Sequence, residues 1–290
     1  MVYLILCIIC NALLAVIFKG FEKHKVDNHH AIVVNYFVCV LTASLAIGQF
    51  ALPQDLFHKP WFPYALGLSF LFIVGFNILA LAFQKCGVAL TIIIQKMSIV
   101  MPVLFAVIFF NESLGWLKIA GLLCAIGAII LVNLPGGNNK LEFDRRWLFL
   151  PILTLVMSGI IEIDLYYVEV AELVGEDGLL FTASAFGMAG FFGLIYSFWR
   201  WINGDIFIRG KDVLGGLVLG VPNFLTIYLL LVILKLGWEG SVLFPTSSIG
   251  TLILTAIIGI VAYKELVTRN KVGGLVLAAV AIALIGLSQV

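Results

Sequence analysis

The amino-acid sequence predicts an all-α, polytopic membrane protein with ten transmembrane helices. Three observations favour this fold class. The composition is 62% hydrophobic and 11% charged, whereas soluble domains carry about a quarter charged residues. The mean hydropathy is +1.15. Apolar runs of about 20 residues, the length that crosses the hydrocarbon core, fill nearly all of the 290 residues.

Ten such segments follow one another along the chain. We expect spans at residues 2–22, 31–50, 61–85, 88–110, 115–134, 147–170, 178–199, 212–235, 240–262 and 271–289. The first segment follows Met1 without a basic n-region, so we expect a transmembrane helix there and not a cleaved signal peptide. The most polar linker, 135–146, contains Pro, Gly and Asn, which interrupt helices. It divides the ten spans into five plus five.

The second half of the chain repeats part of the first at an offset of 153 residues. The offset aligns ESLGWLKIAGLLCAIGAIILVNL, from Glu112, with ELVTRNKVGGLVLAAVAIALIGL, from Glu265, and nine of the 23 positions are identical. Because each half holds an odd number of spans, the second copy is expected to be inverted. Inverted repeats are a recurring build of secondary transporters, with the substrate site near the midplane. We therefore predict two five-helix repeats, 1–134 and 147–290, and a transporter that is not an enzyme.

This arrangement resembles the EamA-like family of the drug/metabolite transporter superfamily. In each half, an acidic residue after the fourth span is followed nine residues later by glycine: Glu112 with Gly121, and Glu265 with Gly274. Lys19, late in the first span, is similar to a lysine often found there. The resemblance covers essentially the whole chain. It implies transport of small metabolites such as amino acids, nucleosides or amphipathic compounds.

Lys96 is the most informative polar residue of the expected spans. It lies eight residues into the span 88–110, about 12 Å along a helix that rises about 1.5 Å per residue. That is near the middle of a hydrocarbon core about 30 Å thick. A charge at this depth costs at least about 2.5–3.5 kcal/mol and normally faces a cavity or a partner. We interpret Lys96 as a substrate contact, with snorkelling to the interface as the alternative.

The candidate substrate-binding residues share a polar side chain inside an expected span; they are Lys96, Gln95, Ser98, Asn77, Glu162, Asn223, Ser248 and Thr251. Gln95 and Ser98 lie on one helical stripe with Thr91 and Pro102. The 153-residue offset maps Gln95 and Ser98 onto Ser248 and Thr251, so both halves are expected to line one cavity. The alternative for the hydroxyls is interhelical hydrogen bonding. Lys96 aligns with Ile249 and has no polar counterpart.

The acidic residues divide into two groups. Glu162 shares a helix face with Ser158 and is expected to pair with Lys96 or Lys19 or to carry a coupling proton; interfacial exposure is the alternative. Asp164 points about 160° away from Glu162 at about 3.6 residues per turn. Glu112 and Glu265 lie at span ends, where capping or hinge roles are expected. The glycine series Gly187/Gly190/Gly193 and Gly216/Gly220 suits close helix packing.

No cofactor or metal site is expected. Cys7 and Cys10 form C-x-x-C inside a membrane helix, which is the wrong context for a redox or metal site. His24, His29 and His30 are expected in a solvated loop. With no histidine in any expected span, an intramembrane enzyme is the weaker alternative to a transporter; a lipid-carrier flippase of the same fold is the other.

The basic residues indicate an orientation. Thirteen Lys and Arg side chains fall in odd-numbered loops and three in even-numbered loops. The positive-inside rule then places the odd loops in the cytoplasm and both termini outside, whereas members of the resembled family are usually drawn with both termini in the cytoplasm. Both orientations stay open. The expected partners are a small-molecule substrate, the lipid of a bacterial cytoplasmic membrane and a coupling proton or ion; the net charge of +1 argues against nucleic acid, and no oligomeric state follows.

Overall fold

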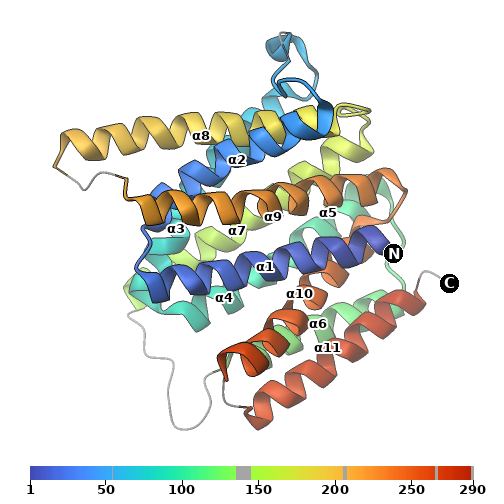
Figure 1. The fold of residues 1–290 in the computed structure, drawn as a ribbon. Helices are drawn as coiled ribbons and strands as arrows, with labels where there is room; N and C mark the ends of the chain where they lie inside the picture. The colour runs from blue at the N-terminus through green and yellow to red at the C-terminus, as the bar shows by residue number, and fades with distance from the viewer. Residues whose placement is uncertain (54, 135–144, 205–207, 265–266, 289–290) are drawn as a thin grey trace. The chain divides into compact units, whose positions relative to one another are not determined.

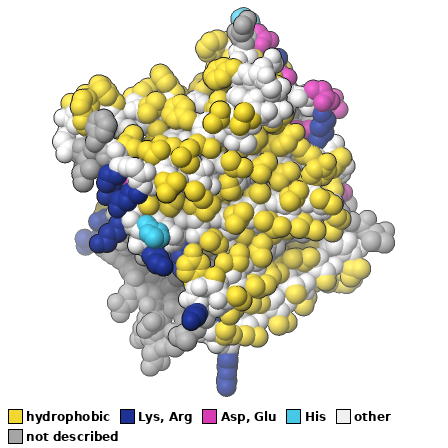
Figure 2. Space-filling view, viewed as in Figure 1, with side chains coloured by type: hydrophobic (Ala, Val, Ile, Leu, Met, Phe, Trp, Pro, Cys, Tyr) yellow, Lys and Arg dark blue, Asp and Glu magenta, His cyan; other side chains and the backbone are white. Residues whose placement is uncertain are grey.

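The computed structural model of this protein describes residues 1–53, 55–134, 145–204, 208–264 and 267–288, and every regular element within these ranges is a helix (Figure 1). Ten of these helical segments are long and apolar enough to cross a membrane. The all-α prediction and the number of spans are thereby confirmed. Hydrophobic side chains cover most of the face seen in Figure 2, as expected for helices that contact lipid.

The helices follow one another along the chain with short connections. Their bounds are α1 (Val2–His24), α2 (Asn28–Ile47), η1 (Leu56–His58), α3 (Phe62–Cys86), α4 (Val88–Lys96), η2 (Met97–Ile99), α5 (Val100–Phe110), α6 (Trp116–Asn133), η3 (Arg145–Trp147), α7 (Phe149–Val170), α8 (Gly178–Ile202), α9 (Gly210–Lys235), α10 (Gly240–Tyr263) and α11 (Arg269–Leu287). All ten spans lie within a few residues of the expected segments.

The fourth span differs from the single helix that was expected over 88–110. A 3₁₀ turn, η2, interrupts it directly after Lys96 and separates α4 from α5. A 3₁₀ stretch inside a helix is tighter than the α form and often marks a functional hinge. The aligned helix of the second half, α10, is continuous even though Pro245 lies inside it. The break is therefore a feature of the first half, next to its lysine.

The chain divides into two compact units. Unit 1 comprises residues 1–74 and 167–235, and unit 2 comprises residues 75–166 and 236–290. Each unit takes segments from both halves of the sequence, and the helices α3 and α7 contribute to both units. The expected division at the linker 135–146 describes a sequence repeat and stays a prediction; the linker itself lies almost wholly outside the described residues.

In unit 1, α2 packs against α8 and α9 along glycine faces. A Cβ atom added to Gly220 of α9 would lie 2.4 Å from the Val38 Cβ atom, and one added to Gly216 would lie 2.5 Å from the Ala31 carbonyl oxygen. On α8, a Cβ atom at Gly193 would lie 2.7 Å from Val33. The prediction that these glycines permit close helix packing is confirmed, because no larger side chain fits at these positions without displacing α2.

In unit 2, α6 packs against α11, and α10 packs against both. A Cβ atom added to Gly121 would lie 2.5 Å from Ile285, and one added to Gly274 would lie 2.7 Å from Val132. These two contacts are reciprocal, since an offset of 153 relates Gly121 to Gly274 and Val132 to Ile285. Small residues thus let α6 and α11 approach closely.

The same offset relates two helix ends in unit 2. The residue that follows α5, Asn111, has φ 55°, and the residue that follows α10, Lys264, has φ 52°. Their backbone N–H groups donate to the carbonyl oxygens of Ala106 and Gly259 respectively. Both are left-handed helix caps, and they precede the repeated glutamates. Glu265 itself lies outside the described residues.

Candidate substrate site in unit 2

Seven of the eight predicted site residues belong to unit 2, and the structure brings four of its polar side chains together. The Gln95 amide of α4 donates to the Ser158 hydroxyl of α7 at 3.1 Å. One turn further along α7, the Glu162 carboxylate interacts electrostatically with the Lys96 ammonium. Gln95 of α4 therefore contacts the α7 stripe that Ser158 and Glu162 share.

Glu162 keeps unused hydrogen-bonding capacity. Its Oε2 atom is buried and accepts no hydrogen bond from any described residue, and Asp164 Oδ2 is in the same state. A buried carboxylate oxygen without a donor costs free energy unless a cation, a proton or a ligand satisfies it. Lys96 supplies charge at Glu162 without a direct ion pair within the described contacts, so the free carboxylate oxygen can accept a hydrogen bond from a polar ligand group.

The break in the fourth span lies beside this cluster. Ser98 is a buried residue of η2, and α10 packs against both η2 and α5. Ser248 and Thr251 of α10 are half-buried. The Thr251 hydroxyl donates to the Ser247 carbonyl of its own helix at 2.8 Å, so its proton is already used within α10. The Ile249 side chain, which aligns with Lys96, is fully buried in the apolar core of unit 2.

The two asparagines predicted for the site, Asn77 and Asn223, belong to different units. Asn77 is half-buried on the part of α3 that belongs to unit 2. Asn223 belongs to unit 1, where its side-chain amide donates to the Asn35 Oδ1 atom of α2 at 3.3 Å. The Cys39 thiol lies 3.4 Å from the Gly220 carbonyl oxygen in the same seam. Asn223 thus takes part in helix packing, and Pro222 lies inside a continuous α9 without breaking it.

Glu112 has the capping role that its position predicts, but it caps another helix. One carboxylate oxygen accepts from the Tyr166 hydroxyl at 2.6 Å and from the Gly240 backbone N–H at 2.8 Å. The other accepts from the Ser241 N–H at 2.9 Å. Gly240 begins α10, so a negative charge sits at the positive end of that helix.

A second polar group at this helix start was not foreseen. Lys118 is 3% exposed, and its ammonium donates to the Ser113 carbonyl at 2.8 Å, to the Ser241 hydroxyl at 3.0 Å and to the Glu239 carboxylate. Lys118 lies within the expected span 115–134, and the 153-residue offset aligns it with Lys271, but neither observation identifies its partners. Its two side-chain partners, Glu239 and Ser241, lie 121 and 123 residues further along the sequence. Local sequence patterns do not reveal contacts over such separations.

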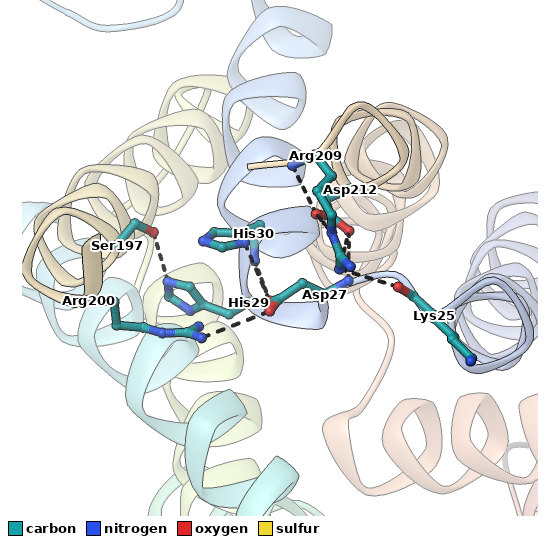
Figure 3. A network of polar contacts seen from close by, with 8 residues as sticks. All are labelled: Lys25, Asp27, His29, His30, Ser197, Arg200, Arg209 and Asp212. Atoms are coloured by element: carbon teal, nitrogen blue, oxygen red, sulfur yellow. Dashed lines mark hydrogen bonds and ion pairs between the residues drawn. The ribbon is translucent and has the colours of Figure 1, made fainter. Parts of the chain in front are cut away.

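The histidine prediction was wrong for two of its three residues. His29 and His30 lie in the first turn of α2, which begins three residues earlier than expected, and they are 7% and 5% exposed. Asp27 caps this helix by accepting from the His30 backbone N–H at 3.2 Å. The His29 Nε2 atom lies 2.9 Å from the Ser197 hydroxyl (Figure 3). Polar partners make the burial of these rings possible, and one span does contain histidine.

This correction removes one argument against an intramembrane enzyme, but among the described residues the contacts of His29 do not form a catalytic triad. A nucleophilic serine needs a base that a third group orients. Ser197 and His29 are in contact, yet the His29 Nδ1 atom has no hydrogen-bond partner among the described residues. The nearby Asp27 carboxylate lies 3.7 Å from the ring of His30 instead. The pair therefore serves to join α2 to α8.

Near His29 and His30, a buried carboxylate, Asp212, joins the start of α9 to the start of α2 (Figure 3). Asp212 is fully buried and accepts from the Asp27 backbone N–H at 2.8 Å and from the Arg209 Nε atom at 2.9 Å. The hydrogen bond to Asp212 raises the pKa of Arg209. Near the opposite ends of α8 and α9, a hydrogen bond to Asp177 likewise raises the pKa of Lys59. These contacts fix loops to helix ends.

Comparison with known proteins agrees with this architecture. Residues 1–134 match the family described as the EamA-like transporter family. An uncharacterized protein of Haemophilus influenzae is 26% identical, over 96% of this chain and 95% of its own. A solved crystal structure of a protein, 14% identical, superposes with a TM-score of 0.77 over 99% of this chain and 96% of that one. At this identity the structure shows a shared fold alone.

The family match and the ten apolar helices together identify the kind of molecule. The matched segment contains the Glu112 and Gly121 positions on which the resemblance depends, and the chain has the membrane-spanning helices that such a transporter needs. This is a multi-pass membrane protein by its ten long apolar helices, and its residues 1–134 are similar to the EamA-like transporter family.

Proposed function

We propose that this protein is a secondary transporter of small organic metabolites, amino acids or related compounds among them, in the cytoplasmic membrane of a bacterium. The observation that carries the proposal is the cluster of Gln95, Lys96, Ser158 and Glu162 beside the break in the fourth span. A half-buried lysine and a half-buried glutamate with one buried, unused carboxylate oxygen suit a substrate that carries a charged group. No described residue set offers a catalytic alternative.

The broken helix supports alternating access as the mechanism. Interrupted transmembrane helices at a midplane site, within inverted repeats, are common in secondary transporters. The reciprocal glycine contacts and the paired left-handed caps share one 153-residue offset, which supports an inverted repeat. In this proposal η2 is the point at which α4 and α5 change their mutual angle. Lys96 binds an acidic group of the substrate, and Glu162 takes up a proton or a basic group.

The test is transport by the purified protein in lipid vesicles. A thermal-shift screen of the proteinogenic amino acids in detergent first selects a compound that stabilises the chain, and its counterflow is then measured. We expect Lys96→Ala to reduce transport roughly tenfold or more, since a charge-assisted hydrogen bond is worth about 1.5–3 kcal/mol. Lys23→Ala, which removes an exposed lysine of α1, is the matched control.

Normal expression and unchanged transport by Lys96→Ala would contradict the proposed site. A loss that is equal in Lys96→Ala and Lys23→Ala would mean that general surface charge, and not the cluster, supports transport. Glu162→Gln is measured in the same series. We expect it to lower transport while leaving substrate affinity closer to wild type, if Glu162 carries the coupling proton.

A further inference from the structure

A small pocket in unit 1 lies near the ends of α7, α8 and α9. Its volume is about 90 Å³, room for about three water-sized groups at roughly 30 Å³ each. The residues that line it include Glu169, Glu176, Leu179, Tyr228, Leu231 and Lys235. None of these residues belongs to the proposed substrate site, so the pocket needs an explanation of its own.

Glu169 is the unusual member of this lining. It is the next-to-last residue of α7 and is 9% exposed, yet it lines the pocket. None of the described residues donates a hydrogen bond to its carboxylate. The nearest candidate, Lys235, directs its ammonium to Glu176 at 2.8 Å and to the Gly175 carbonyl at 3.2 Å. Because Glu169 lines the pocket and no described residue donates to it, its carboxylate can accept hydrogen bonds from a bound ligand.

The charge of the pocket selects a cation. Two carboxylates and one ammonium leave one net negative charge among the lining residues. The C-terminal ends of α7 and α9, at Val170 and Lys235, add the partial negative charge of helix carbonyls. One helix N-terminus, that of α8 at Gly178, adds partial positive charge, so the two negative helix ends outweigh it. An anionic ligand would have to overcome this net negative charge.

The walls select an organic cation. Leu179 and Leu231 are apolar, and the Tyr228 side chain offers an aromatic surface, which attracts ammonium groups. A bare inorganic ion would leave both the apolar wall and most of the volume unused. We propose that this pocket binds a small primary ammonium ion, with its –NH₃⁺ group on the Glu169 carboxylate and its alkyl part against Leu179 and Leu231.

The experiment uses the full chain in detergent and isothermal titration with propylammonium chloride. We expect saturable binding by the wild type and a loss of affinity of roughly tenfold or more in Glu169→Gln, the effect of one charge-assisted hydrogen bond. Glu172→Gln is the matched control. It removes the same charge from an exposed position three residues away that does not line the pocket, and its affinity should stay within about twofold of wild type.

A second variant keeps the test decisive if Glu169→Gln folds poorly. Lys235 is partly exposed, and Lys235→Gln removes the competing cation, so we expect propylammonium to bind more tightly. Three results would each overturn the proposal. They are no binding by the wild type, equal binding by Glu169→Gln and Glu172→Gln, and weaker binding by Lys235→Gln. So would displacement by an equal concentration of sodium chloride, or equally tight binding of sodium propionate. Because binding is measured without transport, failure here leaves the proposed transport function untouched.

Discussion

At the scale of single residues, the best-defined polar group is the Glu112 carboxylate at the start of α10. It accepts three hydrogen bonds, two of them from backbone N–H groups of a helix terminus. The first N–H groups of a helix have no partner within the helix. A single carboxylate from the connection between α5 and α6 therefore satisfies groups that would otherwise be unpaired in a membrane protein.

This arrangement predicts an order of stability. Glu112→Gln removes the charge at the helix start, and we expect it to lower the unfolding free energy by about 1.5–3 kcal/mol. Tyr166→Phe removes one neutral donor and keeps the ring, so its cost should be smaller, about 0.5–1.5 kcal/mol. Thermal unfolding in detergent, followed by circular dichroism, measures both. If Tyr166→Phe proved the more damaging change, the carboxylate would not be the centre of this cap.

At the scale of helices, glycine faces decide how closely neighbours approach. Two neighbouring helices pack glycines against α2. These are Gly216 and Gly220 of α9, and Gly187, Gly190 and Gly193 of α8. The backbones come close enough that a Cβ atom would collide with Val34, Val38 or the Ala31 carbonyl. In lipid such van der Waals contact is a main source of helix association.

Gly220→Ala should therefore destabilise unit 1, by about 1–3 kcal/mol as for other overpacked sites. The added methyl group would lie 2.4 Å from Val38. Gly20→Ala is the matched control, because no atom lies within 4 Å of a Cβ added there and alanine favours the helix. We expect its melting temperature to equal or exceed that of wild type. Equal effects of the two substitutions would refute the close α2–α9 packing.

At the scale of the whole molecule, the distribution of charge along unit 1 bears on orientation. The end of unit 1 at the start of α2 and α9 carries Lys25, Arg209 and Lys211. The connection between α7 and α8 carries Glu172, Glu176 and Asp177, beside Lys235. Basic residues gather in cytoplasmic loops, so the first of these ends is expected inside.

Cysteine labelling tests this orientation in cells. With a membrane-impermeant maleimide, Glu176→Cys should react in intact cells, whereas Lys23→Cys should react only after the membrane is permeabilised. Both positions are exposed, and four of the five native cysteines are buried, so background labelling should be low. The reverse pattern would place both termini in the cytoplasm, as members of the family are usually drawn.

The sequence by itself determined the ten spans, the 153-residue offset between similar segments and the glycine faces. It also predicted Gln95, Lys96 and Glu162 as site residues, which stays a prediction. Each of these depends on local properties: hydrophobic length, helical period and side-chain size. Only the tertiary structure decided that His29 and His30 are buried, that Glu112 caps α10, that Asn223 pairs with Asn35 and that the fourth span breaks after Lys96. The physical reason is that a polar group becomes stable in a membrane through its partner. Most of those partners lie a hundred residues or more away along the chain.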